Sequence, residues 1–391
     1  MPQPAIQIIT TIFWISLTLT IYTYFLYPII LKVSSWCLNI KEKHRRVKYM
    51  NLPTVTMIIS AYNEISCIEE KILNCKALDY PTDKITFLIG SDGSNDGTNE
   101  ILTELQNNAF GVTIKTERQG KVAMLNDLAQ KATSEIIVFS DANTIYDHDA
   151  IIQLVQHFET KSVGCAIGKL SLRDEQTTTS NCSTEGLYWR YENVIKKLES
   201  KLGIVPTING GIFAIRTHLY QQLPCNAITE DQVLGMKIMT QGYQCRFAET
   251  ARAVEAVSTI SGELKRRIRI SAGNFQSLLF VPRILNPFTG PVSFAFISHK
   301  FIRWMVPFLM ITMMLCNIYL ATYSPLFHFL LKSQIGFYLL AVVGAVMPNM
   351  AKIVKPMAIC HYFVFMNFAI LIGFYKFATN TQKTTWSVAK R

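Results

Sequence analysis

The chain has 391 residues, of which 50% are hydrophobic and 17% are charged, so it is too apolar for an ordinary soluble protein of several domains. Its net charge of +11 is concentrated beside apolar segments and in residues 265–269, which suits an anionic membrane surface or a phosphate-bearing ligand. The sequence contains no nucleic-acid-binding motif. Its nine scattered cysteines, without a CxxC pair, argue against a zinc site or a disulfide scaffold.

The first predicted element is a membrane anchor within residues 1–32. Residues 11–31 carry no charge and are long enough to cross the roughly 30 Å hydrocarbon layer as a helix. They lack a charged n-region and a cleavage site, so we expect the anchor to remain uncleaved. Basic residues that follow the anchor predict a cytoplasmic central region. These residues are Lys32, Lys41, Lys43, Arg45, Arg46 and Lys48.

Residues 50–257 are the predicted cytoplasmic domain, in which short β-rich runs alternate with helical stretches. This alternation predicts an α/β fold with a mostly parallel central sheet. The predicted strands are 55–60, 86–90, 112–114 and 135–139, and the predicted helices are 67–76, 99–106, 122–131 and 232–240. Because parallel strands end at one edge, we expect Asp92 and Asp141 to lie close together in a ligand crevice.

The C-terminal third is predicted to return to the membrane. Residues 258–302 combine prolines, basic residues and apolar residues, as in an amphipathic layer at the membrane surface. Residues 303–377 contain about three further spans, and residues 378–391 form a polar, basic tail. The three spans are predicted at 305–323, 335–351 and 357–375. We expect His299 to be structural and Trp304 to anchor the chain at the membrane interface.

Three acidic signals carry the candidate chemistry. Asp92 would accept a hydrogen bond from a nucleobase NH or a ribose hydroxyl. Asp141 and Asn143 would together reach one hard cation or one ribose. Asp231 would take a proton from an attacking hydroxyl. Each signal also has an ordinary structural reading. The first two would be polar turns, and Asp231 would cap the helix that follows it.

The basic run contains Arg267 and Arg269, and a diphosphate is the anion that suits two guanidinium groups. Residues two apart do not share a helix face, so both would reach one phosphate only in an extended segment or at a helix end. The alternative is a juxtamembrane patch that contacts lipid head groups.

Together these features resemble the membrane-embedded family 2 glycosyltransferases, a group that includes cellulose, chitin and hyaluronan synthases and the Nod-factor backbone synthase. The likeness covers about Val55 to Gln276 and includes Ala61-Tyr62-Asn63-Glu64 and Gly120-Lys121. It implies a GT-A fold and an inverting transfer from a nucleotide sugar, usually UDP-linked, with Mg²⁺ or Mn²⁺. It also implies an integral protein of the inner or plasma membrane with a cytoplasmic catalytic domain.

The resemblance also implies a role for individual residues. Asp231 would be the general base, and Asp141 and Asn143 would serve the metal, with Asn143 standing where the family usually has a second Asp. The donor side would comprise Tyr62, Glu64, Asp92, Lys121, Asp141, Arg267 and Arg269. The acceptor side would comprise Gly210, Gly211, Glu230 and Trp189, with Tyr188 beside Trp189 in an aromatic platform.

One departure from the family concerns the acceptor. Where the polymer synthases have Gln-Arg-x-Arg-Trp, this chain has Arg266-Arg267-Ile268-Arg269-Ile270, so the Gln and the acceptor-stacking Trp are absent. Processive polymerisation therefore does not follow. The leading hypothesis is a membrane-bound inverting glycosyltransferase that builds or extends a cell-surface polysaccharide or glycolipid. Single addition to a lipid-linked acceptor and a non-catalytic nucleotide-sugar-binding scaffold are the alternatives.

The expected partners are a nucleotide sugar, a saccharide or lipid-linked acceptor, and membrane lipids, without nucleic acid. The need for a partner subunit is left open.

Overall fold

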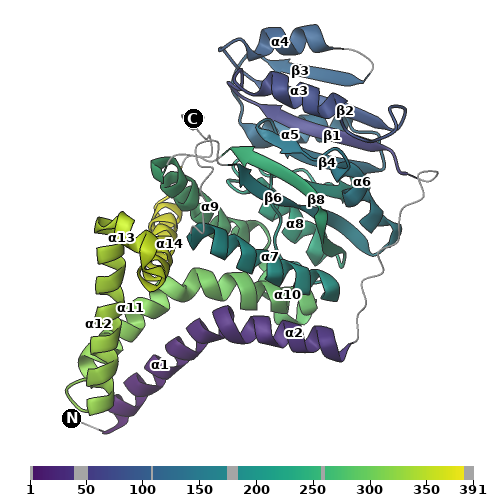
Figure 1. The fold of residues 1–391 in the computed structure, drawn as a ribbon. Coiled ribbons are helices and arrows are strands. Elements are labelled where there is room, and N and C mark those ends of the chain that lie inside the picture. Colours follow the sequence, from purple (N-terminus) through teal and green to yellow (C-terminus); the bar gives the residue numbers. More distant parts are fainter. Residues whose placement is uncertain (1–2, 39–51, 107–108, 174–183, 257–259, 383–391) are drawn as a thin grey trace.

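The computed structural model describes residues 3–38, 52–106, 109–173, 184–256 and 260–382. It consists of a sheet domain and a set of long helices beside it (Figure 1). The basic residues expected to orient the anchor lie outside the described residues from Lys41 to Lys48, as does the end of the tail, residues 383–391.

The sheet domain contains one mixed sheet of eight strands. The strands are β1 (Val55–Ala61), β2 (Ile85–Asp92), β3 (Phe110–Lys115), β4 (Ile136–Asp141), β5 (Thr144–Tyr146), β6 (Val163–Arg173), β7 (Phe213–Arg216) and β8 (Gln244–Ala256). Their order is β3-β2-β1-β4-β7-β6-β8-β5. β1 to β4 pair in parallel, as do β6 and β8, whereas β7 runs antiparallel to β4 and β6, and β5 runs antiparallel to β8. The sheet is therefore mostly parallel, as predicted.

Helices cover both faces of this sheet (Figure 1). They are α3 (Ile68–Lys76), α4 (Thr98–Leu105), α5 (Lys121–Lys131), α6 (Ala150–Val155), η3 (Gln156–Glu159), α7 (Thr184–Leu202), η4 (Thr217–Leu219) and α8 (Glu230–Thr240). All seven residues of β1 are buried, as expected of a central strand. Successive side chains alternate between the two cores, with Met57 and Ile59 in one core and Ile58 in the other.

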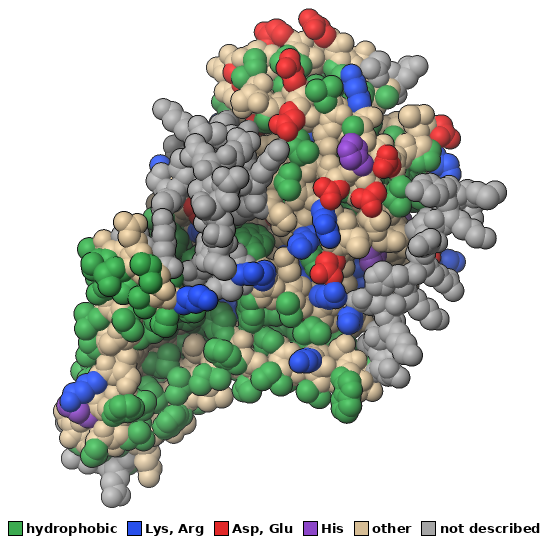
Figure 2. Space-filling view, in the orientation of Figure 1, with side chains coloured by type: hydrophobic (Ala, Val, Ile, Leu, Met, Phe, Trp, Pro, Cys, Tyr) green, Lys and Arg blue, Asp and Glu red, His purple; other side chains and the backbone are tan. Residues whose placement is uncertain are grey.

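Four helical segments among the described residues are long and apolar enough to cross a membrane: Pro4–Cys37, Pro291–Leu320, Pro325–Val346 and Lys355–Ala378. Figure 2 shows apolar side chains over much of this helical part, whereas acidic side chains gather on the sheet domain. The helices and turns of this part are α1 (Gln3–Ile21), η1 (Tyr22–Leu26), α2 (Tyr27–Cys37), α9 (Ile260–Phe280), η5 (Pro282–Leu285), η6 (Pro287–Thr289), α10 (Pro291–Phe296), η7 (Ile297–Phe301), α11 (Ile302–Leu320), α12 (Pro325–Val346), α13 (Pro348–Ile353) and α14 (Lys355–Ala378).

Two predicted spans need new boundaries. The helical segment predicted at 305–323 begins at Pro291, and the one predicted at 335–351 runs from Pro325 to Val346. Proline is favoured in the first turn of a helix, and both α12 and α13 begin with one. Pro348 therefore separates α12 from α13 and lies outside the second span.

The early start of the Pro291–Leu320 segment is explained by buried ion pairs with α7. His299 Nδ1 lies 2.8 Å from Glu199 Oε1, Lys300 Nζ lies 2.8 Å from Glu192 Oε2, and Arg303 also pairs with Glu192. The carboxylates of α7 offset the polar and charged side chains of this segment, which in the sequence alone make it look too polar to be part of a membrane span. They also join the segment to the sheet domain, so His299 has the structural role expected of it.

Trp304 does not lie at an interface. Its side chain is 6% exposed and packs against Phe275 and Phe296, with ring centroids 5.9 and 5.4 Å away. The expected interfacial anchor is therefore a core residue. The sequence places it beside charged residues, but the ion pairs with α7 bury that part of the helix.

Candidate active site

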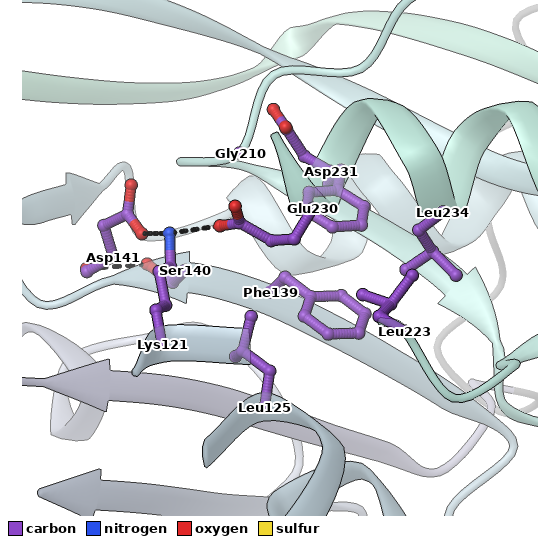
Figure 3. A pocket seen from close by; sticks show the side chains of 11 residues that line it. Lys121, Leu125, Phe139, Ser140, Asp141, Gly210, Leu223, Glu230, Asp231 and Leu234 are labelled. Atoms are coloured by element: carbon purple, nitrogen blue, oxygen red, sulfur yellow. Dashed lines mark hydrogen bonds and ion pairs between the residues drawn. The ribbon is translucent and has the colours of Figure 1, made fainter. Parts of the chain in front are cut away.

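One lysine joins the second and third of the three acidic signals. Lys121 Nζ lies 2.6 Å from Asp141 Oδ1 and 2.7 Å from Glu230 Oε1 (Figure 3). Asp141 ends β4, Lys121 begins α5 and Glu230 begins α8, so the two ion pairs hold three elements together. Asp231 follows Glu230 in the same turn of α8.

These groups share a small pocket with apolar neighbours. Figure 3 shows the Lys121 amine between the two carboxylates, with the apolar side chains on one side of them. Such neighbours exclude water and strengthen the electrostatic interactions between the charged groups. The apolar lining residues are Leu125, Phe139, Phe213, Leu223 and Leu234.

Asp231 has the environment of a general base. Burial, reinforced by the charge of Glu230, raises the pKa of Asp231 to about 6. A carboxylate with this pKa is ionised at neutral pH and remains basic enough to accept a proton from a hydroxyl. A Cβ atom on Gly210 would lie 3.2 Å from Asp231 Oδ2, so glycine keeps this side of the carboxylate open.

The helix α9 corrects the expected pairing of Arg267 with Arg269. Because α9 is helical from Ile260, these two residues are roughly 200° apart around its axis and do not share a face. Arg267 instead pairs with Glu263 one turn earlier. Arg266 and Arg269, three apart, do share a face.

The shared face of Arg266 and Arg269 is directed at the end of β4. Burial would raise the pKa of Asp141, but Lys121, followed by Arg266 and Arg269, outweighs burial and lowers it. Three cationic side chains from α5 and α9 therefore act on one carboxylate. Such a concentration of positive charge is typical of a site for a diphosphate.

Oxygen ligands for a divalent cation are present at the same strand end. Asp141 and Asn143 flank the turn between β4 and β5, and Asn143 Nδ2 donates to Glu255 Oε1 at 3.2 Å. Within the described residues, no group of three or more His, Cys, Asp or Glu side chains could hold a metal ion. These oxygens nevertheless fit Mg²⁺ or Mn²⁺, which commonly bind through one or two carboxylates together with substrate phosphates and water.

Comparison with protein families identifies the domain. The model of glycosyl transferase family 2 matches residues 56–223, which include β1 to β7 and the segment with Lys121 and Asp141. Residues 56–223 are therefore similar to a family 2 glycosyltransferase domain. The chain is also 28% identical over 234 residues to poly-beta-1,6-N-acetyl-D-glucosamine synthase from Staphylococcus aureus (strain COL), and the match covers 58% of this chain and 56% of the relative.

A poly-beta-1,6-N-acetyl-D-glucosamine synthase from Staphylococcus epidermidis is 26% identical over 278 residues, covering 70% of this chain and 64% of that relative. The chain thus spans a little over half of the length of the curated relatives it matches. A mannosyltransferase from Pyrobaculum calidifontis, solved in complex with GDP-Man and Mn²⁺, superposes with a TM-score of 0.71 and 22% identity. That match covers 94% of this chain and 99% of the other, and it establishes the GT-A fold.

Asp92, a predicted donor residue, contacts the backbone directly before Lys121, the residue that pairs with Asp141. The carboxylate of Asp92 accepts hydrogen bonds from the backbone N–H groups of Gln119 (2.8 Å) and Gly120 (2.7 Å), directly before Lys121. Gly120 has φ +98°, a conformation that favours glycine. The ends of β2 and β4 therefore both contact the start of α5, which accords with the crevice predicted between Asp92 and Asp141.

The other two predicted donor residues lie in the loop after β1. The guanidinium group of Arg118 stacks over the ring of Tyr62 at 3.7 Å from its centroid. Glu64 is buried, and its carboxylate accepts from the thiol of Cys67 at 3.1 Å. Their contact with a nucleotide stays a prediction.

The predicted acceptor residues separate into two groups. Gly210 and Glu230 line the pocket beside Asp231. Gly211 instead contacts β5, because a Cβ atom there would lie 3.2 Å from Thr144 Oγ1. Trp189 lies on α7 outside the residues that line this pocket, so the predicted aromatic platform remains a prediction.

Two groups beside the site were missed in the sequence. Arg266 is recognisable once the segment is known to be helical, from its spacing to Arg269. Lys71 is fully buried, and its Nζ donates to Ser140 Oγ (2.7 Å) and to the carbonyl of Thr144 (2.5 Å), on either side of the Asp141–Asn143 turn. Its position three residues after Ile68, on the apolar face of α3, is a usable signal.

Proposed function

We propose that the chain is a membrane-bound inverting glycosyltransferase that transfers a sugar from a nucleotide-sugar donor, UDP-linked by resemblance, to a saccharide or lipid-linked acceptor. The observation that carries the proposal is the Lys121 bridge between Asp141 and Glu230, with Asp231 in the same pocket. It brings the side chains suited to a diphosphate and the candidate base into one site. An inverting single displacement needs both of these on the two sides of the reacting sugar carbon.

The chain's own residues would act in the following way. Asp231 accepts the proton of the acceptor hydroxyl as its oxygen attacks the anomeric carbon, and the bond from that carbon to the diphosphate breaks on the opposite side. Lys121, Arg266 and Arg269 stabilise the negative charge that develops on the departing nucleoside diphosphate. A divalent cation held by Asp141 and Asn143 would supply further neutralisation of that charge when bound.

We further propose that the catalytic domain faces the cytoplasm, where nucleotide sugars are made, in keeping with the basic residues after the first span. The relatives named poly-beta-1,6-N-acetyl-D-glucosamine synthase favour a polysaccharide product. Ile270, in the position where the polymer synthases have Trp, favours single addition to a lipid-linked acceptor. The length of the product distinguishes these two outcomes.

The test of the proposal is an assay of purified protein in detergent with Mn²⁺ and a panel of UDP- and GDP-sugars. We expect release of the nucleoside diphosphate from one donor and a matching mass increase of a membrane-extracted acceptor. A ladder of masses would indicate polymerisation, and one added sugar would indicate single transfer. Binding of UDP or GDP without hydrolysis or transfer from any donor would favour the scaffold hypothesis instead.

The rate of transfer should fall as the pH drops through about 6. The pKa of Asp231 lies at about 6, so below that pH the carboxylate carries a proton and cannot accept another. We expect the acid limb of kcat/KM to have a midpoint near this value and a slope of about tenfold per pH unit. In Glu230→Gln the midpoint should move to lower pH, since the charge of Glu230 raises the pKa of Asp231. A midpoint near the ordinary aspartate value of 3.8 would contradict the assignment.

The faces of α9 predict that Arg269 contributes to diphosphate binding and that Arg267 does not. Arg269→Gln should weaken UDP binding by about tenfold, while uridine binding stays unchanged, because a single charge-assisted hydrogen bond to phosphate contributes about 1.5–3 kcal/mol. Arg267→Gln is the matched control on the other face and should change UDP binding much less. Calorimetric titration with UDP and uridine measures both. A larger loss in the Arg267 variant would restore the original pairing of Arg267 with the diphosphate.

A further inference from the structure

We propose that Glu255 supplies the second negative charge of the divalent-cation site. This inference rests on the metal-assisted donor binding proposed above and adds a ligand from a strand more than a hundred residues away. In this chain Asn143 stands where the family usually has a second Asp. The pair Asp141 and Asn143 therefore carries one negative charge fewer than the family's pair of aspartates.

The charge at the turn is low for a cation site. Asp141 is the only carboxylate between Ser140 and Thr144, and its Oδ1 is already paired with Lys121. An amide oxygen binds Mg²⁺ or Mn²⁺, but the affinity of oxygen sites rises with the number of charged ligands. A second carboxylate is therefore required beside Asn143 if the site is to match an Asp–Asp pair.

The sheet register brings Glu255 to this place. β5 pairs antiparallel with the end of β8, and Glu255 lies directly opposite Thr144, the residue after Asn143. The carboxylate of Glu255 accepts from Asn143 Nδ2 at 3.2 Å, so the Asn143 amide uses its nitrogen for Glu255 and keeps its oxygen for another partner.

Glu255 also forms a longer ion pair with Arg266 in the described structure. Its Oε2 lies 3.6 Å from Arg266 Nη2, longer than a hydrogen bond to a guanidinium group, and its side chain is 15% exposed. Arg266 belongs to the face of α9 directed at Asp141. Glu255 therefore contacts both Arg266 and the Asn143 amide, and together with Asp141 and Asn143 it would hold the cation.

The experiment measures Mn²⁺ binding by electron paramagnetic resonance of the full-length protein in detergent, with saturating UDP or GDP. Glu255→Gln should weaken Mn²⁺ binding by about tenfold or more, a loss typical of removing a residue that supports a metal. Asn143→Asp in the Glu255→Gln background should restore most of the affinity, because it returns the missing charge to the same site. Glu249→Gln is the matched control, since Glu249 is on the same strand and forms an exposed pair with Lys197.

Each outcome decides the proposal. If the wild-type protein binds Mn²⁺ and Glu255→Gln binds it with the same affinity, the role of Glu255 is overturned, while the proposed metal-assisted donor site stands. In the Glu255→Gln background, recovery of Mn²⁺ affinity on adding Arg266→Gln, but not on adding Asn143→Asp, would also overturn the proposal. Glu255 would then act only by neutralising the charge of Arg266. Absence of nucleotide-dependent Mn²⁺ binding in the wild-type protein would overturn this inference together with the metal-assisted donor site. Thermal melts of each variant show whether the fold is retained.

Discussion

Asp231→Asn is expected to abolish sugar transfer while leaving nucleotide binding nearly intact. Asparagine keeps the shape of the side chain but cannot accept the proton of the acceptor hydroxyl. Loss of a general base costs about 10²–10⁴-fold in rate. We propose that nucleotide binding depends on the ends of β2 and β4 and on α9, so the affinity for UDP or GDP should change by less than about threefold.

The same substitution should stabilise the protein at neutral pH. The pKa of Asp231 in the folded protein, about 6, lies above the ordinary value of 3.8, so the folded state disfavours its ionised form. The resulting penalty appears as pH rises from about 4 to 6 and is complete above that range, where it reaches at most about 3 kcal/mol. Asparagine carries no charge and avoids this penalty, so its melting temperature at pH 7 should be higher.

Asp127→Asn is the matched control for both measurements. Asp127, on α5, forms an ion pair with Lys115 at the end of β3, and the Asp127 side chain is 44% exposed. Neither the rate of transfer nor the melting temperature should change appreciably. Turnover within tenfold of wild type in Asp231→Asn would remove Asp231 as the base, whatever the melting temperature does.

The sequence predicted the donor half of the fold because local pattern and topology agree there. The predicted strands near residues 55, 86 and 135 match β1, β2 and β4 to within a few residues. Each is an apolar run that ends at a small or acidic residue, the usual form of a buried parallel strand. The strands that end at Asp92 and Asp141 both pair in parallel with β1, so both residues lie at one edge of the sheet, as the rule that parallel strands end at one edge predicts.

The parts that the sequence could not predict depend on contacts between distant segments. Nothing near Asn143 indicates Glu255, which is brought there by the pairing of β5 with β8. The sequence did not predict the start of the Pro291–Leu320 segment, because Lys300 and Arg303 form their ion pairs with α7, more than a hundred residues earlier. The arginine pair was assigned by spacing without knowing that α9 is helical at that point.

The position of α7 relates the membrane segments to the candidate acceptor side. Glu192 and Glu199 on α7 hold the Pro291–Leu320 segment through buried ion pairs. On the same helix, the buried Lys196 donates to Asn209 Oδ1 at 2.9 Å, directly before Gly210. Gly210 in turn leaves space beside Asp231. One helix therefore contacts both the Pro291–Leu320 segment and the loop beside Asp231, which suits an acceptor that approaches from the membrane.

Lys121→Met is expected to have the second large effect, because it acts on stability and chemistry together. It leaves Asp141 and Glu230, with side chains 29% and 13% exposed, without their common cation. Breaking a buried ion pair by removing one partner typically costs about 3–5 kcal/mol, and solvent access here favours the lower end. We expect a melting temperature several degrees lower than wild type, together with weaker binding of UDP or GDP.

The pH dependence of the Lys121 variant separates its chemical effect from simple loss of stability. Lys121 lowers the pKa of Asp231 against the effects of burial and Glu230, so its removal should move the acid limb of kcat/KM to higher pH. A merely unstable protein would lose activity without moving that limb. Lys197→Met, which breaks an exposed ion pair with Glu249, should shift neither the limb nor the melting temperature. If Lys121→Met melts like wild type and keeps the same acid limb, the bridge between Asp141 and Glu230 does not organise the site.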